Sequence, residues 1–123
     1  MSLFEVNRID KPWGYEIHWA VTDQYVGKIL FIKAGESLSR QYHKIKDETI
    51  YVLSGKMKFI VGKAPDDLKE IVLEPGHSYH IEPHEIHQMI SIDDTTVLEA
   101  STPQLDDVVR LVDRYGREGT TAP

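Results

Sequence analysis

Three polar side chains that lie close together in the sequence are of types that bind metal ions. Gln41 and His43 are two residues apart, and Glu48 follows shortly after them. Residues two apart on a strand point to the same face, so Gln41 and His43 would project together. Glu48 could point back toward them from the start of the next strand. An amide oxygen, a neutral imidazole and a carboxylate suit a borderline divalent ion such as Zn, Fe, Mn, Co or Ni.

A fourth ligand would have to come from a later part of the chain. His87 is the candidate, because it follows the turn Glu82-Pro83-His84-Glu85 at a point where a strand begins. Taken singly, a histidine on a strand is more often a hydrogen-bonded structural residue than a ligand, and a glutamine is a rare ligand. The four side chains therefore make a metal site only if the fold brings them together.

The elements that would position these residues are short strands. No segment shows the sustained apolar spacing of an amphipathic helix. The expected strands are residues 15–21, 25–33, 37–43, 49–53, 56–62, 68–73, 78–82, 86–92 and 95–100. Residues 105–115 fit either a short helix or a final strand. Many short strands without helices between them indicate an all-β sandwich or barrel. We expect one domain over residues 1–123, with a barrel core at about 13–101 and a C-terminal tail at 102–123.

Composition narrows the possible partners. The chain of 123 residues has room for one domain and carries a formal net charge of −6. Its pI is about 5.4 and its basic residues are scattered, which argues against a nucleic-acid partner. No apolar run is long enough to cross a bilayer and no secretory signal pattern is visible, so we expect no membrane partner. The absence of cysteine excludes a thiolate metal site and fits a cytoplasmic protein.

The segment from Gly35 to Gly55 resembles the first motif of the cupin family, G-x5-H-x-H-x4-E-x6-G. The glycines, the second histidine and the glutamate of the motif are in register, and Gln41 stands where the first histidine usually stands. The second cupin motif ends with a proline turn followed by a histidine, and Pro83 and His87 match it in a degenerate form. The resemblance implies a small cupin jelly-roll barrel.

A closer resemblance is to the cupin domain of type II mannose-6-phosphate isomerases, which often follows a guanylyltransferase domain. Segments similar to that family are KPWGYE at 11–16, LSRQYH at 38–43, DDVVR at 106–110 and YGR at 115–117. The likeness covers roughly residues 11–117, nearly the whole chain.

A Gln-His-Glu-His ligand set is usual in phosphomannose isomerases. The resemblance therefore implies that Gln41, His43, Glu48 and His87 bind one divalent ion, with Zn as the first expectation and Fe, Mn, Co or Ni as alternatives. It also implies a small-molecule substrate, a sugar or sugar phosphate, that undergoes aldose–ketose isomerisation.

Isomerisation needs a base that reaches a carbon-bound proton. The candidates near the expected barrel mouth are His84, Glu85, His80 and Lys46. We assign the base to His84, which sits on the turn before a proposed ligand where the family commonly has Gly. A solvated turn histidine is the alternative. Lys46, where the family commonly has Arg, is the candidate for holding a phosphate, because Arg40 should point away from the site by strand alternation.

Two other functions fit the same ligands. One is a different cupin enzyme, such as an iron-dependent dioxygenase, and the other is a non-catalytic module that binds a carbohydrate or a small acid. We also expect a homodimer, in which Leu3, Phe4 and Val6 would supply apolar contacts.

Overall fold

The computed structural model describes residues 3 and 5–117, and this part of the chain folds as eleven strands without a helix. The strands are β1 (Asn7–Lys11), β2 (Gly14–Val21), β3 (Val26–Ile32), β4 (Arg40–Tyr42), β5 (Glu48–Ser54), β6 (Met57–Gly62), β7 (Leu68–Leu73), β8 (Ser78–Ile81), β9 (Ile86–Ser91), β10 (Thr95–Ser101) and β11 (Val109–Val112). No helix among the described residues is long and apolar enough to span a membrane.

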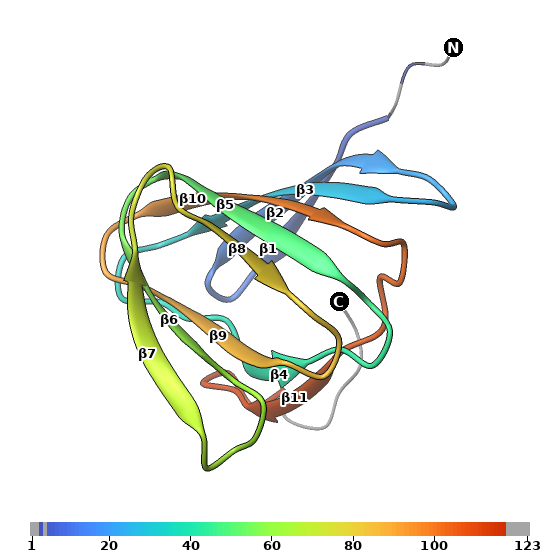
Figure 1. Ribbon diagram of the computed structural model, residues 1–123. Coiled ribbons are helices and arrows are strands. Elements are labelled where there is room, and N and C mark those ends of the chain that lie inside the picture. The colour runs from blue at the N-terminus through green and yellow to red at the C-terminus, as the bar shows by residue number, and fades with distance from the viewer. Residues whose placement is uncertain (1–2, 4, 118–123) are drawn as a thin grey trace.

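Two antiparallel sheets face each other and curve into a barrel (Figure 1). One sheet has the order β1-β2-β3-β10-β5-β8, and the other has the order β11-β4-β9-β6-β7. Because β10 lies between β3 and β5, and β9 lies between β4 and β6, strands distant in sequence are neighbours, as in a jelly roll. The prediction of an all-β jelly-roll barrel is confirmed.

The sequence pattern located the nine central strands but not the first one. β1 pairs with β2 at the edge of its sheet and has mostly exposed side chains, so it lacks the apolar alternation that marks a half-buried strand. The ambiguous residues 105–115 contain a strand, β11, which pairs with β4. Both end strands lie outside residues 13–101, and each extends one of the two sheets.

The inward positions change from polar to apolar along the barrel. On β5, Glu48 is followed on the same face by Ile50 and Val52, both fully buried. On β9, His87 is followed by Met89 in the same way. Since alternate residues share a face, the apolar residues fill the barrel interior and the polar ones gather at one end. The core therefore forms the floor beneath the polar end.

The turn between β5 and β6 depends on Gly55. Its φ of +92° favours glycine, and an added Cβ would lie 2.2 Å from the carbonyl oxygen of Asp94. Gly76 has the same φ but open space around it, so it is a matched control.

We expect Gly76→Ala to lower the free energy of unfolding by about 1–2 kcal/mol through backbone strain. Gly55→Ala should lower it by about 3 kcal/mol or more, because the chain near Asp94 must also shift. Urea denaturation measures both values. Equal losses of unfolding free energy in the two variants would show that the close contact with Asp94 contributes no cost beyond backbone strain.

Candidate metal centre

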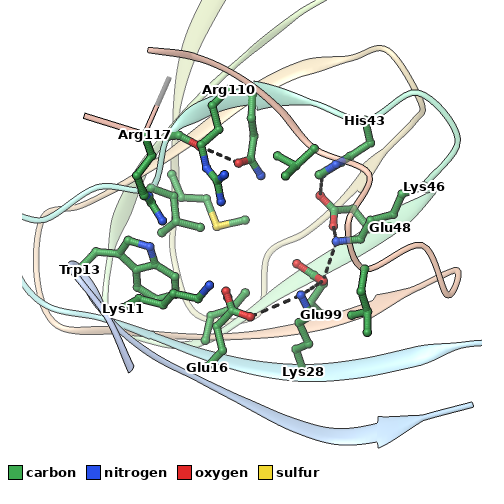
Figure 2. Close-up of a pocket in the computed structure, with 17 residues that line it drawn as sticks. Lys11, Trp13, Glu16, Lys28, His43, Lys46, Glu48, Glu99, Arg110 and Arg117 are labelled. Carbon is green, nitrogen blue, oxygen red and sulfur yellow. Dashed lines mark hydrogen bonds and ion pairs between the residues drawn. The ribbon is translucent and has the colours of Figure 1, made fainter. Parts of the chain in front are cut away.

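Three of the four predicted ligands meet at the polar end of the barrel. Glu48 Oε1 lies 3.3 Å from Nε2 of His43 and 3.2 Å from Nε2 of His87. One ligand atom from each residue lies within 4.8 Å of the others, and all three side chains are buried. Figure 2 shows His43 and Glu48 side by side at the wall of a pocket. The fold thus joins residues that come from β5, β9 and the loop after β4.

Hydrogen bonds set the tautomer of both histidines. Nδ1 of His43 lies 2.5 Å from the carbonyl oxygen of Asp107, and Nδ1 of His87 lies 3.0 Å from that of Glu85. A carbonyl oxygen only accepts, so each Nδ1 must carry the proton and donate it. In a neutral imidazole this leaves a lone pair on Nε2, and neither Nε2 has a hydrogen-bond partner among the described residues.

This arrangement fits a divalent cation. Two nitrogen lone pairs and a carboxylate oxygen that face one another in a buried site repel, unless a cation lies among them. Atoms bound at about 2.1 Å to one ion lie roughly 3.0–3.4 Å apart at octahedral or tetrahedral angles. The separations of 3.2 and 3.3 Å lie in that range. His43, Glu48 and His87 would therefore hold the ion, and the donor set suits the borderline metals.

Gln41 lies next to this cluster on β4. It is opposite His87 in the pairing of β4 with β9, and its side chain lines the pocket. Its amide oxygen accepts a hydrogen bond of 2.7 Å from the hydroxyl of Ser39. An amide oxygen has two lone pairs, so this bond is compatible with a second interaction. Its role as the fourth ligand stays a prediction.

Asp107 positions the loop that carries His43 and was not among the predicted site residues. Its carboxylate accepts hydrogen bonds from the backbone N–H groups of Lys44, Ile45 and Lys46, at 2.7–3.0 Å. Burial would raise the pKa of this carboxyl, but these bonds outweigh it and lower the pKa. Its carbonyl oxygen also orients His43, so one residue fixes both the loop and the imidazole.

Lys46 lies beside the cluster as predicted. Its ammonium nitrogen is 3.0 Å from Glu48 Oε2 and 3.3 Å from Glu99 Oε2. Burial alone would lower the pKa of Lys46, but the two carboxylates outweigh burial and raise it. Lys46 therefore keeps its proton at neutral pH, which fits a charge-bearing role and not that of a base.

A row of buried charges continues from Lys46 across the larger sheet. Lys28 lies opposite both His18 and Glu99 in the strand pairing, and its ammonium is 3.4 Å from Glu16 and 4.0 Å from Glu99. Glu16 also lies 2.8 Å from Nε2 of His18. Figure 2 shows Glu16, Lys28, Glu99 and Lys46 following one another along the pocket wall. Opposite charges alternate along this row.

The two glutamates of this row differ in acidity. Burial favours the protonated form of both. In Glu16 the hydrogen bond with His18 and the charge of Lys28 outweigh burial and lower the pKa to about 2. In Glu99 burial, with repulsion from Glu48, outweighs the attraction of the lysines and raises the pKa. The sequence shows these charged residues on strands, but it does not show which face of each strand points into the barrel. The row could therefore be recognised only from the structure.

The other candidates for the base, His84, Glu85 and His80, are not among the residues that line the pocket. His84 is exposed, and its ring stacks on Tyr42 with centroids 6.2 Å apart; it is not among the residues that line the pocket. Its φ of +68° explains why glycine suits this turn in the resembled family. His80 is exposed and lies 2.7 Å from Asp47. The base role of His84 stays a prediction.

A sequence model described as the cupin domain matches residues 28–100. The chain belongs to the cupin family. The match covers more than half of the chain, and all four predicted ligands lie within it.

Individual proteins agree with this assignment. The chain is 33% identical over 112 residues to mannose-1-phosphate guanylyltransferase of Escherichia coli strain K12. The aligned region makes up 87% of this chain but only 22% of that protein. This cupin thus spans about a fifth of the length of that relative.

Two solved structures share the fold. KdgF from Halomonas sp. aligns with a TM-score of 0.69 and 18% identity, over 81% of this chain and 88% of its own. Oxalate decarboxylase of Bacillus subtilis, a protein with Mn(II) centres, aligns with a TM-score of 0.73 and 15% identity, over 85% of this chain and 29% of its own.

We expect protein purified without chelator to contain a divalent metal, and His43→Ala and His87→Ala each to lose most of it. His77→Ala is the control, because His77 is an exposed histidine outside the cluster. Elemental analysis gives the metal-to-protein ratio. Equal ratios in all four proteins would rule out the proposed ligands.

Proposed function

We propose that this cupin is a metal-dependent isomerase that interconverts an aldose phosphate and a ketose phosphate, of the mannose-6-phosphate isomerase type. The observation that carries the proposal is the buried cluster of His43, Glu48 and His87 at the wall of a charged pocket. The relative named as a mannose-1-phosphate guanylyltransferase and the KPWGYE, DDVVR and YGR segments support the sugar-phosphate class.

The reaction moves a proton between two adjacent carbons and places negative charge on substrate oxygens. A divalent ion, for which Zn is our first choice, would supply a Lewis acid for those oxygens. Lys46 is buried at the same wall and keeps its positive charge, so it favours negative charge that develops nearby. Glu48 and Glu99 hold the Lys46 ammonium in place.

Two residues are candidates for the base. His84 is the prediction from sequence, and it would have to reach the carbon-bound proton directly or through one water. Glu99 is the alternative from the structure, because its carboxyl lines the pocket and its pKa is raised by burial. A base with a raised pKa holds a proton more readily near neutral pH.

Turnover of mannose 6-phosphate to fructose 6-phosphate by metal-loaded protein tests the function. Glu48→Gln should lower kcat by at least about 100-fold, because a ligand carboxylate is lost. His77→Ala should leave kcat unchanged. Failure to convert any member of a broad panel of aldose and ketose phosphates would refute the isomerase. In that case, oxygen consumption with iron or ligand binding without turnover would support the dioxygenase or the binding module.

His84→Gly and Glu99→Gln identify the base. Glycine suits the φ of +68° at position 84, so this variant removes the imidazole without straining the turn. If His84 is the base, His84→Gly lowers kcat by about 100-fold or more. An unchanged kcat in His84→Gly, together with a loss in Glu99→Gln, would transfer the role to Glu99.

The homodimer stays a prediction, as does a cytoplasmic location. Leu3 and Val6 are exposed, at 99% and 59% of their surface, and Phe4 lies outside the described residues. Light scattering should give twice the monomer mass of 14.1 kDa. A mass near that of one chain would contradict the dimer.

A further inference from the structure

Three cationic side chains line the pocket without a role in the proposed reaction. They are Lys11, Arg110 and Arg117, here called the cation cluster, and Figure 2 shows them extending into the pocket from the side away from His43 and Glu48. We propose that the cation cluster binds the anionic group of the substrate, a phosphate monoester or a carboxylate. The inference rests on the proposed function only in taking this pocket as the substrate site.

The fold brings the cation cluster together from both ends of the chain. Lys11 is the last residue of β1 and pairs with Gly14 across the turn that precedes β2. Arg110 lies on β11 and pairs with Gln41. Arg117 follows β11 after a further turn. Because Gln41 also pairs with His87, β4 lies between the strand that carries Arg110 and the strand that carries His87.

Asp113 holds Arg117 in a defined orientation. The backbone N–H, Nε and Nη2 of Arg117 donate to the Asp113 carboxylate at 2.7, 2.8 and 3.1 Å. Asp113 is buried, so this contact anchors the guanidinium at its place in the pocket wall. A planar guanidinium fixed in advance suits the oxygens of a phosphate or a carboxylate, since little side-chain freedom is lost on binding.

The distribution of charge makes an anion the fitting ligand. Five cationic side chains and three glutamates line the pocket. The row of buried charges places the glutamates next to Lys28 and Lys46. Arg110 and Arg117 lie across the pocket from this row, and Lys11 lies beside its end at Glu16 (Figure 2). With Asp113 counted beside Arg117, five cations face four carboxylates, so an excess of one positive charge remains, which a divalent ion would increase.

Mutual repulsion shows that the three cations act on one another. Burial is the largest cause that lowers the pKa of Lys11, and repulsion from Arg117 and Arg110 adds to it, against the attraction of Glu16. Burial likewise lowers the pKa of Arg110, and repulsion from Arg117 adds to it, against the attraction of Asp113 and Glu16. A buried group of like charges is stabilised by a bound oxyanion.

Lys46, the residue first expected to hold the phosphate, is ion-paired with two carboxylates. The cation cluster has three positive charges against the two carboxylates of Asp113 and Glu16, so it is the better site for the anion. A ligand that spans the pocket would then place its reacting oxygens toward His43 and Glu48 and its anionic group toward Arg110 and Arg117. A sugar with an anionic group at one end of its carbon chain has this form.

Calorimetric titration of the metal-loaded full chain with inorganic phosphate tests the inference. We expect Lys11→Gln and Arg117→Gln each to weaken phosphate binding about tenfold or more, because a charge-assisted hydrogen bond is lost. Arg8→Gln is the matched control, since Arg8 is an arginine paired with an aspartate on the exposed surface. It should change the affinity less than about twofold. Lys11→Gln keeps the test valid if Arg117→Gln disturbs the Asp113 contact.

Three further arms separate the possible outcomes. His43→Ala should still bind phosphate; loss of binding there would place the anion on the metal and overturn the inference. The affinities for mannose 6-phosphate and for glucuronate, each compared with that for mannose, show whether the cation cluster prefers a phosphate or a carboxylate. Phosphate binding that is absent in the unaltered protein, or equal in Lys11→Gln, Arg117→Gln and Arg8→Gln, would also overturn it. Phosphate binding is measured without turnover, so the two proposals can fail separately. If the variants lose phosphate affinity but the unaltered protein isomerises no sugar phosphate, the proposed function is refuted and the anion site is kept.

Discussion

The buried carboxylate of Glu48 is the interaction on which the rest of the site depends. One oxygen faces the imidazoles of His43 and His87, and the other faces the ammonium of Lys46. Burial would raise the pKa of Glu48, but the positive charge of Lys46 is the main cause that outweighs burial and lowers it. A buried anion of this kind is stable only while its partners stay in place. Glu48 therefore links the two imidazoles of the His43–Glu48–His87 cluster to the charged wall of the pocket.

The barrel supplies this environment by separating polar and apolar positions along the same strands. Apolar side chains fill the interior below Glu48 and His87, so the site has a closed floor and opens to one side. Charged residues on β2, β3 and β10 then line the wall in a row of alternating sign. In a low-dielectric interior, alternation is what makes so many charges compatible with folding.

The two ends of the chain complete the pocket. The cupin-domain match begins at residue 28 and ends at residue 100, so it contains the candidate metal ligands but neither β1 nor β11. Asp107, beyond the match, orients His43 and holds the loop that carries Lys46. The shared fold thus accounts for the metal cluster, whereas the added end segments shape the rest of the pocket.

The local sequence determined most strands and the candidate ligands. Both the period-two alternation of a strand and the Gly-bounded Q-x-H-x4-E pattern can be recognised within a short segment. The local sequence did not reveal β1, whose exposed edge position removes the alternation. Only the tertiary structure decided that Glu16, Lys28 and Glu99 face one pocket, that His84 lies outside it, and that Lys11 and Arg117 also line it. These facts depend on sheet pairing between segments as far apart as Gln41 and Arg110, and alternation within a strand does not specify which strand lies beside it.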